Sequence, residues 1–284
     1  MNYKEVITYH NGILIKGIEN FDLDATFGNK LVYRWRNLGN RYLGIVKDKV
    51  IQLGYISDGQ LYIDNISLEE FEEWFMSYLD LDKDYTEMYS NLYKEPLLAY
   101  YIGTGKGLRI IKQELIQTVV CNFLTQNEEV MIGHRAIEKL CELYGKEIEY
   151  KGNKFYSFPT LDTLSKLDIE EWRKAKTGYW SSGISLAIKQ FKRLEEEKGD
   201  LTTYFSNMKY DELQKFLGEF YQFRPRVVGN IIDGLRIYKD NMYNTDFNYA
   251  TDINSALHKK LSMKGFGELN LLVKHVLKYY YNIG

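Results

Sequence analysis

The sequence predicts an α+β protein in which a small antiparallel β domain at the N-terminus is followed by an all-helical body. Up to about residue 95, short β-branched and aromatic segments alternate with turn residues. From Leu97 onward, apolar residues recur at the spacing of amphipathic helices. The 284 residues suffice for one large or two modest domains. We therefore expect residues 1–95 to form a β domain with one helix and residues 96–284 to form a helical domain.

The N-terminal part contains several segments with the composition of strands. Asp58-Gly59 separates the last two and is typical of a hairpin turn. Ser67 followed by Glu70 has the pattern of a capping box, which predicts a helix through residues 71–78. The expected strands cover residues 30–36, 41–46, 50–56 and 60–63.

The helical part begins with a clear amphipathic pattern. Apolar residues between Ile116 and Leu124 fall on one face, and the same pattern around Ile137 and Tyr144 makes Cys141 a core residue. The segment from Tyr150 to Phe158 is polar and aromatic and is interpreted as a connection. Further helices are expected at about 168–176, 181–197, 209–220, 226–238 and 266–281.

Composition limits the possible function classes. The two cysteines have no metal-ligand spacing and are too few for an iron–sulfur cluster, so neither a metal nor a cofactor is expected. No apolar run reaches the roughly 20 residues of a membrane span, and the first 17 residues lack the pattern of an export signal. These features predict a cytoplasmic protein. The net charge of −2 still permits a local basic face that attracts nucleic acid.

Several local patterns each have two interpretations. Gln126 and Asn127 end an apolar helix, where amides either cap the helix or read base edges. The adjacent aromatics Tyr179 and Trp180 either pack on the core or wedge between bases. His258, beside two lysines, is either a surface residue or a phosphate contact.

Two further patterns also allow more than one interpretation. Lys274 and Lys278 lie on a basic stripe of the last helix, which is either a solvated face or part of a binding site. The glycine-rich segment 103–107 lacks the G-x-x-x-x-G-K-[ST] pattern of a phosphate loop and is interpreted as a flexible junction.

Taken in chain order, these and other segments resemble the 8-oxoguanine DNA glycosylase family of the helix-hairpin-helix glycosylase superfamily. The resemblance covers about residues 15–284. It implies a helix-hairpin-helix glycosylase body, and as a partner double-stranded DNA with a damaged base, bound by a monomer in base excision repair. The segments that carry it are Phe21-Asp-Leu23, Tyr33-Arg-Trp35, Gly107-Leu-Arg-Ile-Ile-Lys-Gln113, Thr125-Gln-Asn127, Tyr156-Ser-Phe-Pro-Thr160 and Thr177-Gly-Tyr179.

The chain departs from the family at the hairpin that grips DNA. The family's Leu-Pro-Gly-Val-Gly-x-Lys aligns with residues 220–226, Phe-Tyr-Gln-Phe-Arg-Pro-Arg. Both glycines are replaced, although Arg224 and Arg226 could hold phosphate through their side chains. The family's nucleophilic lysine aligns with Arg226, whose guanidinium stays protonated. The resemblance therefore implies that strand cleavage through a Schiff base is lost, unless Lys215 or another lysine replaces it.

The family's catalytic carboxylate has two candidates. Asp252 aligns by motif, since Tyr249-Ala-Thr-Asp252 resembles the family's Val-Pro-Val-Asp and precedes a possible helix. Asp246 matches better by its separation from Arg226. We favour Asp252, which could also simply cap the helix that follows.

The positions that read the bases in the family have also changed. Lys30, Lys274 and Lys278 align with residues of the family's base pocket. The wedge tyrosine is kept as Tyr179, while Trp180 and Gln126 replace residues that read the opposite base. These changes argue against 8-oxoguanine opposite cytosine as the substrate.

The resemblance thus implies a DNA-binding, base-flipping glycosylase that hydrolyses the N-glycosidic bond of a damaged base without lyase activity. The alternative is a catalytically inactive relative that acts as a damaged-DNA binding module. The retained aspartates favour the first interpretation, and the arginine at position 226 favours the second.

Overall fold

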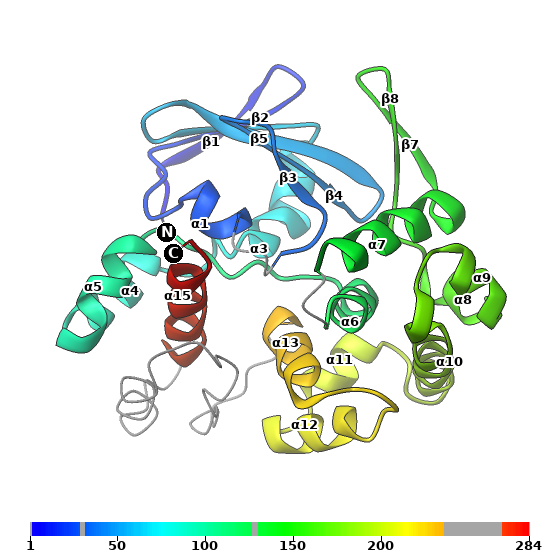
Figure 1. The fold of residues 1–284 in the computed structure, drawn as a ribbon. Helices are drawn as coiled ribbons and strands as arrows, with labels where there is room; N and C mark the ends of the chain where they lie inside the picture. Colours follow the sequence, from blue (N-terminus) through cyan, green and yellow to red (C-terminus); the bar gives the residue numbers. More distant parts are fainter. Residues whose placement is uncertain (1, 29–31, 127–129, 236–268, 284) are drawn as a thin grey trace. The chain divides into compact units, whose positions relative to one another are not determined.

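The computed structural model of the protein contains a six-stranded sheet and a mostly helical remainder, which confirms the α+β prediction (Figure 1). It describes residues 2–28, 32–126, 130–235 and 269–283. The chain forms two compact units. The first comprises residues 1–44, 51–112 and 240–284, and the second comprises 45–50 and 113–239. The first unit thus contains helical segments that the sequence grouped with the domain beginning at residue 96.

The large sheet is antiparallel and has the order β1-β2-β6-β5-β4-β3. Three of its strands lie where the alternating pattern predicted them, and the turn before β6 contains Gly59 at φ 64°. The predicted strand over 30–36 is shorter and shifted, since β3 begins at Trp35. The first two strands, β1 and β2, were not predicted. The strands are β1 Glu5–Tyr9, β2 Gly12–Lys16, β3 Trp35–Asn37, β4 Tyr42–Val46, β5 Lys49–Ser57 and β6 Gln60–Asp64.

The helix predicted after Ser67 is present in the first unit. The Ser67 side chain accepts from the Glu70 N–H while the Glu70 carboxylate accepts from the Ser67 N–H, so the capping box is confirmed. The following π-helical turn buries Phe71 and Phe75. The helices are α1 Leu23–Phe27, α2 Leu68–Glu70, η1 Phe71–Phe75, α3 Met76–Tyr78, α4 Tyr85–Tyr93, α5 Pro96–Thr104 and α15 Asn270–Ile283.

A buried arginine explains why the segment 107–113 is structurally important. The Arg109 guanidinium is 1% exposed and donates to the carbonyls of Asp80 (2.8 Å) and Glu19 (3.2 Å). It lies 4.4 Å from the ring centre of Tyr85. Burial lowers the pKa of Arg109 and raises that of Tyr85. The hydrogen bonds of Arg109 therefore connect the segment 107–113 to two other segments of the first unit, at Glu19 and at Asp80.

The second unit is built around α6, whose side chains are almost all buried. Cys141 of α7 is also buried, as its place in the apolar pattern predicted. None of the helices among the described residues is long and apolar enough to cross a bilayer. The helices are α6 Leu115–Leu124, α7 Val130–Tyr144, α8 Leu161–Ser165, α9 Ile169–Lys174, η2 Gly178–Trp180, α10 Ser181–Lys198, α11 Leu201–Ser206, α12 Tyr210–Gly218 and α13 Pro225–Leu235.

The segment interpreted as a connection is instead a β-hairpin, so that interpretation was wrong. Strands β7 (Glu147–Tyr150) and β8 (Asn153–Tyr156) pair antiparallel and follow α7, as Figure 1 shows. Lys151 and Gly152 have φ angles of 49° and 74°, which fit the tight turns that suit hairpins.

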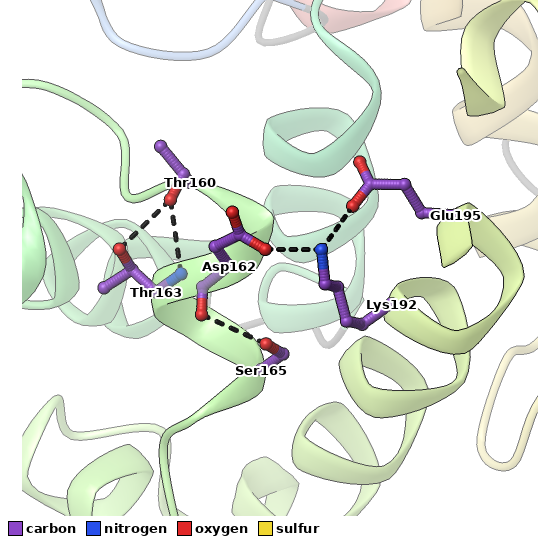
Figure 2. A network of polar contacts seen from close by, with 6 residues as sticks. All are labelled: Thr160, Asp162, Thr163, Ser165, Lys192 and Glu195. Carbon is purple, nitrogen blue, oxygen red and sulfur yellow. Dashed lines mark hydrogen bonds and ion pairs between the residues drawn. The ribbon is translucent and has the colours of Figure 1, made fainter. Parts of the chain in front are cut away.

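A polar network joins α8 to α10 (Figure 2). The Lys192 ammonium group binds the carboxylates of both Asp162 and Glu195, the latter at 2.7 Å. Thr160 caps α8 by accepting from the Thr163 N–H. The bond to Lys192 lowers the pKa of Asp162. The network therefore links α10 to the segment that carries the Phe-Pro-Thr motif.

Candidate nucleic-acid interface

Helices α12 and α13 form a helix-hairpin-helix arrangement at the position predicted from the sequence. The chain leaves α12 through hydrogen bonds from the Phe220 N–H to Leu217 O (3.3 Å) and from the Phe223 N–H to Phe220 O (3.0 Å). Helix α13 then begins at Pro225, a residue suited to a first helical position because its ring fixes φ. The turn is therefore compact and defined by its own backbone.

Gln222 keeps a glycine-like backbone although it is not a glycine. Its φ is 65°, in the left-handed region, which costs a residue with a side chain roughly 1–2 kcal/mol. In the alignment made from the sequence, Gln222 corresponds to the first glycine of the hairpin motif. The turn thus retains the expected backbone path after losing the residue that adopts it most easily.

The start of α13 is electropositive. Arg224 and Arg226 are both exposed there, and the first N–H groups of a helix lack acceptors within the helix. Aligned peptide dipoles add positive potential at this end. Pro225 supplies no N–H, so one of the usual donors is absent. The arrangement suits a phosphate group held mainly by side chains.

Buried hydrogen bonds of Thr177 stabilise the turn that contains Tyr179. The Thr177 hydroxyl donates to Trp172 O (2.7 Å) and lies 2.7 Å from the Ser181 hydroxyl. Tyr179 is 77% exposed and projects from this turn. Trp180 is half-buried, with its ring centre 5.5 Å from that of Phe123. Of the two predicted wedge residues, only Tyr179 stands free on the surface.

The hairpin touches this aromatic turn. The Arg224 guanidinium carbon lies 5.8 Å from the ring centre of Trp180, a cation–π contact. Phe223 packs against Phe123 with ring centres 5.4 Å apart. Residues of α6, the aromatic turn and the hairpin thus come together in the second unit.

Gln126 lies inward rather than on an exposed helix tip. It is 8% exposed, and neither polar atom of its carboxamide has a hydrogen-bond partner among the described residues. The helix end is capped instead by Thr125, whose hydroxyl donates to Cys121 O at 2.7 Å. An unsatisfied buried amide is costly, so Gln126 is a candidate for binding a polar group of a ligand.

Sequence reasoning missed the aspartate on the hairpin helix. Asp233 is 3% exposed and follows Arg226 by seven residues, which places both on the same side of α13. An acidic residue within the apolar run 227–235 was the available signal.

The lysines of the last helix differ in exposure. Lys274 is 5% exposed and Lys278 is half-buried. A buried Lys274 does not fit a fully solvated face, the plainer of its two interpretations. Helix α15 packs on α5 within the first unit, where Val276 lies close to Gly105.

The remaining predicted site residues lie outside the described residues. They are Lys30, Asn127, Asp246, Asp252 and His258. Within the described ranges, no three His, Cys, Asp or Glu side chains come together as metal ligands.

Comparison with known proteins supports the fold. Residues 13–119 match the family model of the N-terminal domain of 8-oxoguanine DNA glycosylases. Among curated proteins, a DNA-3-methyladenine glycosylase from Bacillus subtilis is 23% identical over 182 residues, which cover 57% of this chain and 60% of that protein. The N-glycosylase/DNA lyase OGG1 of Arabidopsis thaliana is 22% identical over 199 residues, covering 68% and 54% respectively. The matches thus span less than two thirds of these relatives.

Solved structures match along the whole chain. The 8-oxoguanine glycosylase/lyase of Clostridium acetobutylicum, in complex with double-stranded DNA containing cytosine opposite 8-oxoguanine, has a TM-score of 0.86 and 24% identity, covering 100% of this chain and 99% of that one. The structure of MBOgg1 with a low-affinity DNA ligand has a TM-score of 0.84 and 26% identity, with the same coverage. The chain has the fold of these proteins, and its residues 13–119 match the N-terminal domain of 8-oxoguanine DNA glycosylases.

Proposed function

We propose that the protein is a DNA glycosylase that flips a damaged base out of double-stranded DNA and hydrolyses its N-glycosidic bond without cleaving the strand. The observation that carries this proposal is Arg226 at the start of α13, where the family has its nucleophilic lysine. A guanidinium remains protonated and does not form a Schiff base. Water is then the nucleophile, and the reaction ends with the base released.

The described side chains support a role in holding DNA. Arg224 and Arg226 are exposed at the positive end of α13, where they can bind phosphate oxygens. Tyr179 projects from a rigid turn and suits the space left by a flipped nucleotide. Gln126, buried without a partner among the described residues, offers a donor and an acceptor to a base edge.

The catalytic acid is proposed to be Asp252, with Asp246 as the alternative. The carboxylate of the catalytic aspartate would stabilise the positive charge that develops on the sugar and would orient the attacking water. The proposed base pocket includes Lys30, Lys274 and Lys278. Its lysines favour anionic groups and argue against 8-oxoguanine opposite cytosine as the substrate.

Two assays test these roles separately. Borohydride trapping with lesion-containing duplexes should give no covalent adduct with the wild-type protein, and an adduct would overturn the loss of lyase chemistry. Arg226→Lys is the matched variant, because it restores an amine at that position. Excision assays on a panel of lesions should yield free base, and Asp252→Asn should lower the rate roughly 100-fold or more. An equal loss in Asp246→Asn alone would move the acid to that residue.

A catalytically inactive damaged-DNA binder is the second candidate. The same arginine favours it, because the family's nucleophile is absent. Release of no base from any lesion, combined with tight and strongly salt-dependent duplex binding, would support this function over hydrolysis. Absence of duplex binding at low salt would contradict both.

A further inference from the structure

The turn between α12 and α13 displays an aromatic ring that the proposed phosphate contacts do not use. Tyr221 is 57% exposed, while its neighbours Phe220 and Phe223 are 8% and 6% exposed. The turn therefore points two phenylalanines inward and one tyrosine outward. Arg224 is exposed as well, so an aromatic ring and a cation both face solvent within four residues.

The inward phenylalanines make a rigid base for this ring. Phe220 stacks on Phe191 of α10 with ring centres 4.8 Å apart, and Phe223 lies 5.4 Å from Phe123 of α6. Tight packing on two helices fixes the backbone on either side of Tyr221. An exposed ring on a fixed backbone loses little conformational entropy when a ligand stacks on it.

The turn is also joined to the neighbouring aromatic turn at two points. The Arg224 guanidinium covers the ring of Trp180 at 5.8 Å. The Gln222 carboxamide fills the space above Gly183, where an added Cβ would lie 2.0 Å from its oxygen. We call Tyr179, Trp180, Tyr221 and Arg224 the aromatic turn surface. Its four members come from two segments of one unit held together by these contacts.

The chemistry of this surface differs from that of a hairpin that binds only phosphates. Glycines in such a hairpin let backbone N–H groups approach phosphate closely, but here Gln222 and Arg224 occupy those positions and Pro225 has no N–H. The surface offers instead two exposed tyrosine rings, Tyr179 and Tyr221, and the guanidinium of Arg224, which lies over the ring of Trp180. Interleaved aromatic and basic side chains bind unpaired strands, because each unpaired base has a free face for stacking.

We propose that the aromatic turn surface binds unpaired DNA bases, with Tyr221 as a stacking residue, so that the protein prefers an unpaired strand or a bubble to fully paired DNA. In a paired duplex the base faces are already stacked, which leaves only phosphates for the arginines. The inference rests on the proposed function to the extent that the ligand is DNA. It narrows the substrate to DNA that is unpaired near the target base.

Binding measurements with three probes test the inference. They are a short single strand, its fully paired duplex, and the same duplex with a central unpaired bubble. The wild-type protein should bind the single strand and the bubble roughly tenfold more tightly than the duplex, as expected for one additional stacked base. Tyr221→Ala should remove this preference and leave duplex binding unchanged, while Tyr221→Phe should retain it.

Matched variants separate stacking from general damage to the protein. Tyr100→Ala removes a tyrosine that is 69% exposed on α5 and should change none of the three affinities. Tyr221→Leu keeps an apolar side chain without a ring and should behave like Tyr221→Ala. Circular dichroism checks that each variant is folded.

Each remaining outcome has a definite meaning. Equal or tighter binding of the fully paired duplex by the wild-type protein would overturn the preference for unpaired bases and leave the proposed function intact. A preference that survives in both Tyr221→Ala and Tyr221→Leu would overturn the assignment to Tyr221. Failure to bind any of the three probes would contradict the proposed function itself.

Discussion

The close approach of α13 to α6 makes Gly234 a position where one added methyl group should destabilise the protein. A Cβ at Gly234 would lie 2.9 Å from Thr118 Cγ2 and 3.2 Å from Gln113 Nε2. The Gln113 N–H also donates to Gly234 O at 3.0 Å, which restrains the helix from moving away. Overpacking of this kind typically costs about 1–3 kcal/mol.

Gly218→Ala is the matched control for Gly234→Ala. Gly218 is also helical, in α12, but nothing lies within 4 Å of a Cβ built there. Each replacement gains roughly 0.5–1 kcal/mol because alanine loses less backbone entropy than glycine. This gain is common to both, so the difference between the two variants isolates overpacking and should be about 1–3 kcal/mol. Urea unfolding measures it, and equal stabilities of the two variants would refute the close contact that fixes the hairpin helix.

Three further predictions concern buried and paired charges. Arg109→Met should lower the free energy of unfolding by about 2–3 kcal/mol, because two carbonyl acceptors lose a charged donor. Unfolding in urea tests this, and an unchanged midpoint of the urea transition would contradict it. Burial raises the pKa of Tyr85 and Tyr89 above 10.0, so the phenols ionise more readily in the unfolded chain and stability should fall as pH rises above that value. Urea unfolding below and above pH 10 measures this, and a free energy of unfolding that does not fall would refute it. The bond to Lys192 lowers the pKa of Asp162 from 3.8, so the ionised carboxylate stabilises the folded protein at neutral pH. Asp162→Asn should therefore lower the free energy of unfolding at neutral pH, and this difference from the wild-type protein should disappear once the pH falls below the lowered pKa. Urea unfolding at several pH values can check this.

The elements that the sequence predicted correctly are those with a strong local signal. Ser67 and Glu70 cap a helix by contacts within four residues, and Asp58-Gly59 forms a turn between two alternating segments. The hairpin 147–156 was missed because its turn is Lys151-Gly152, and lysine is not a usual residue at positive φ.

The candidate site was harder to predict because its geometry depends on distant segments. Whether Trp180 is exposed depends on Phe123 and Arg224, which belong to other elements. Gln126 had the pattern of an exposed tip, yet it is buried. Local patterns indicated which residues are candidates for the site, and tertiary packing decides which of these candidates are exposed.

The division of the chain into units has a consequence for the order of folding during synthesis. The first unit contains both the N-terminal sheet and α15, which packs on α5. Residues 113–239 of the second unit leave the ribosome before α15 does. Helix α5 therefore lacks this packing partner for a time, including the contact between Gly105 and Val276. The apolar residues of α15, such as Leu272 and Val276, which are buried in the finished protein, therefore find their place on α5 only after the second unit has been made.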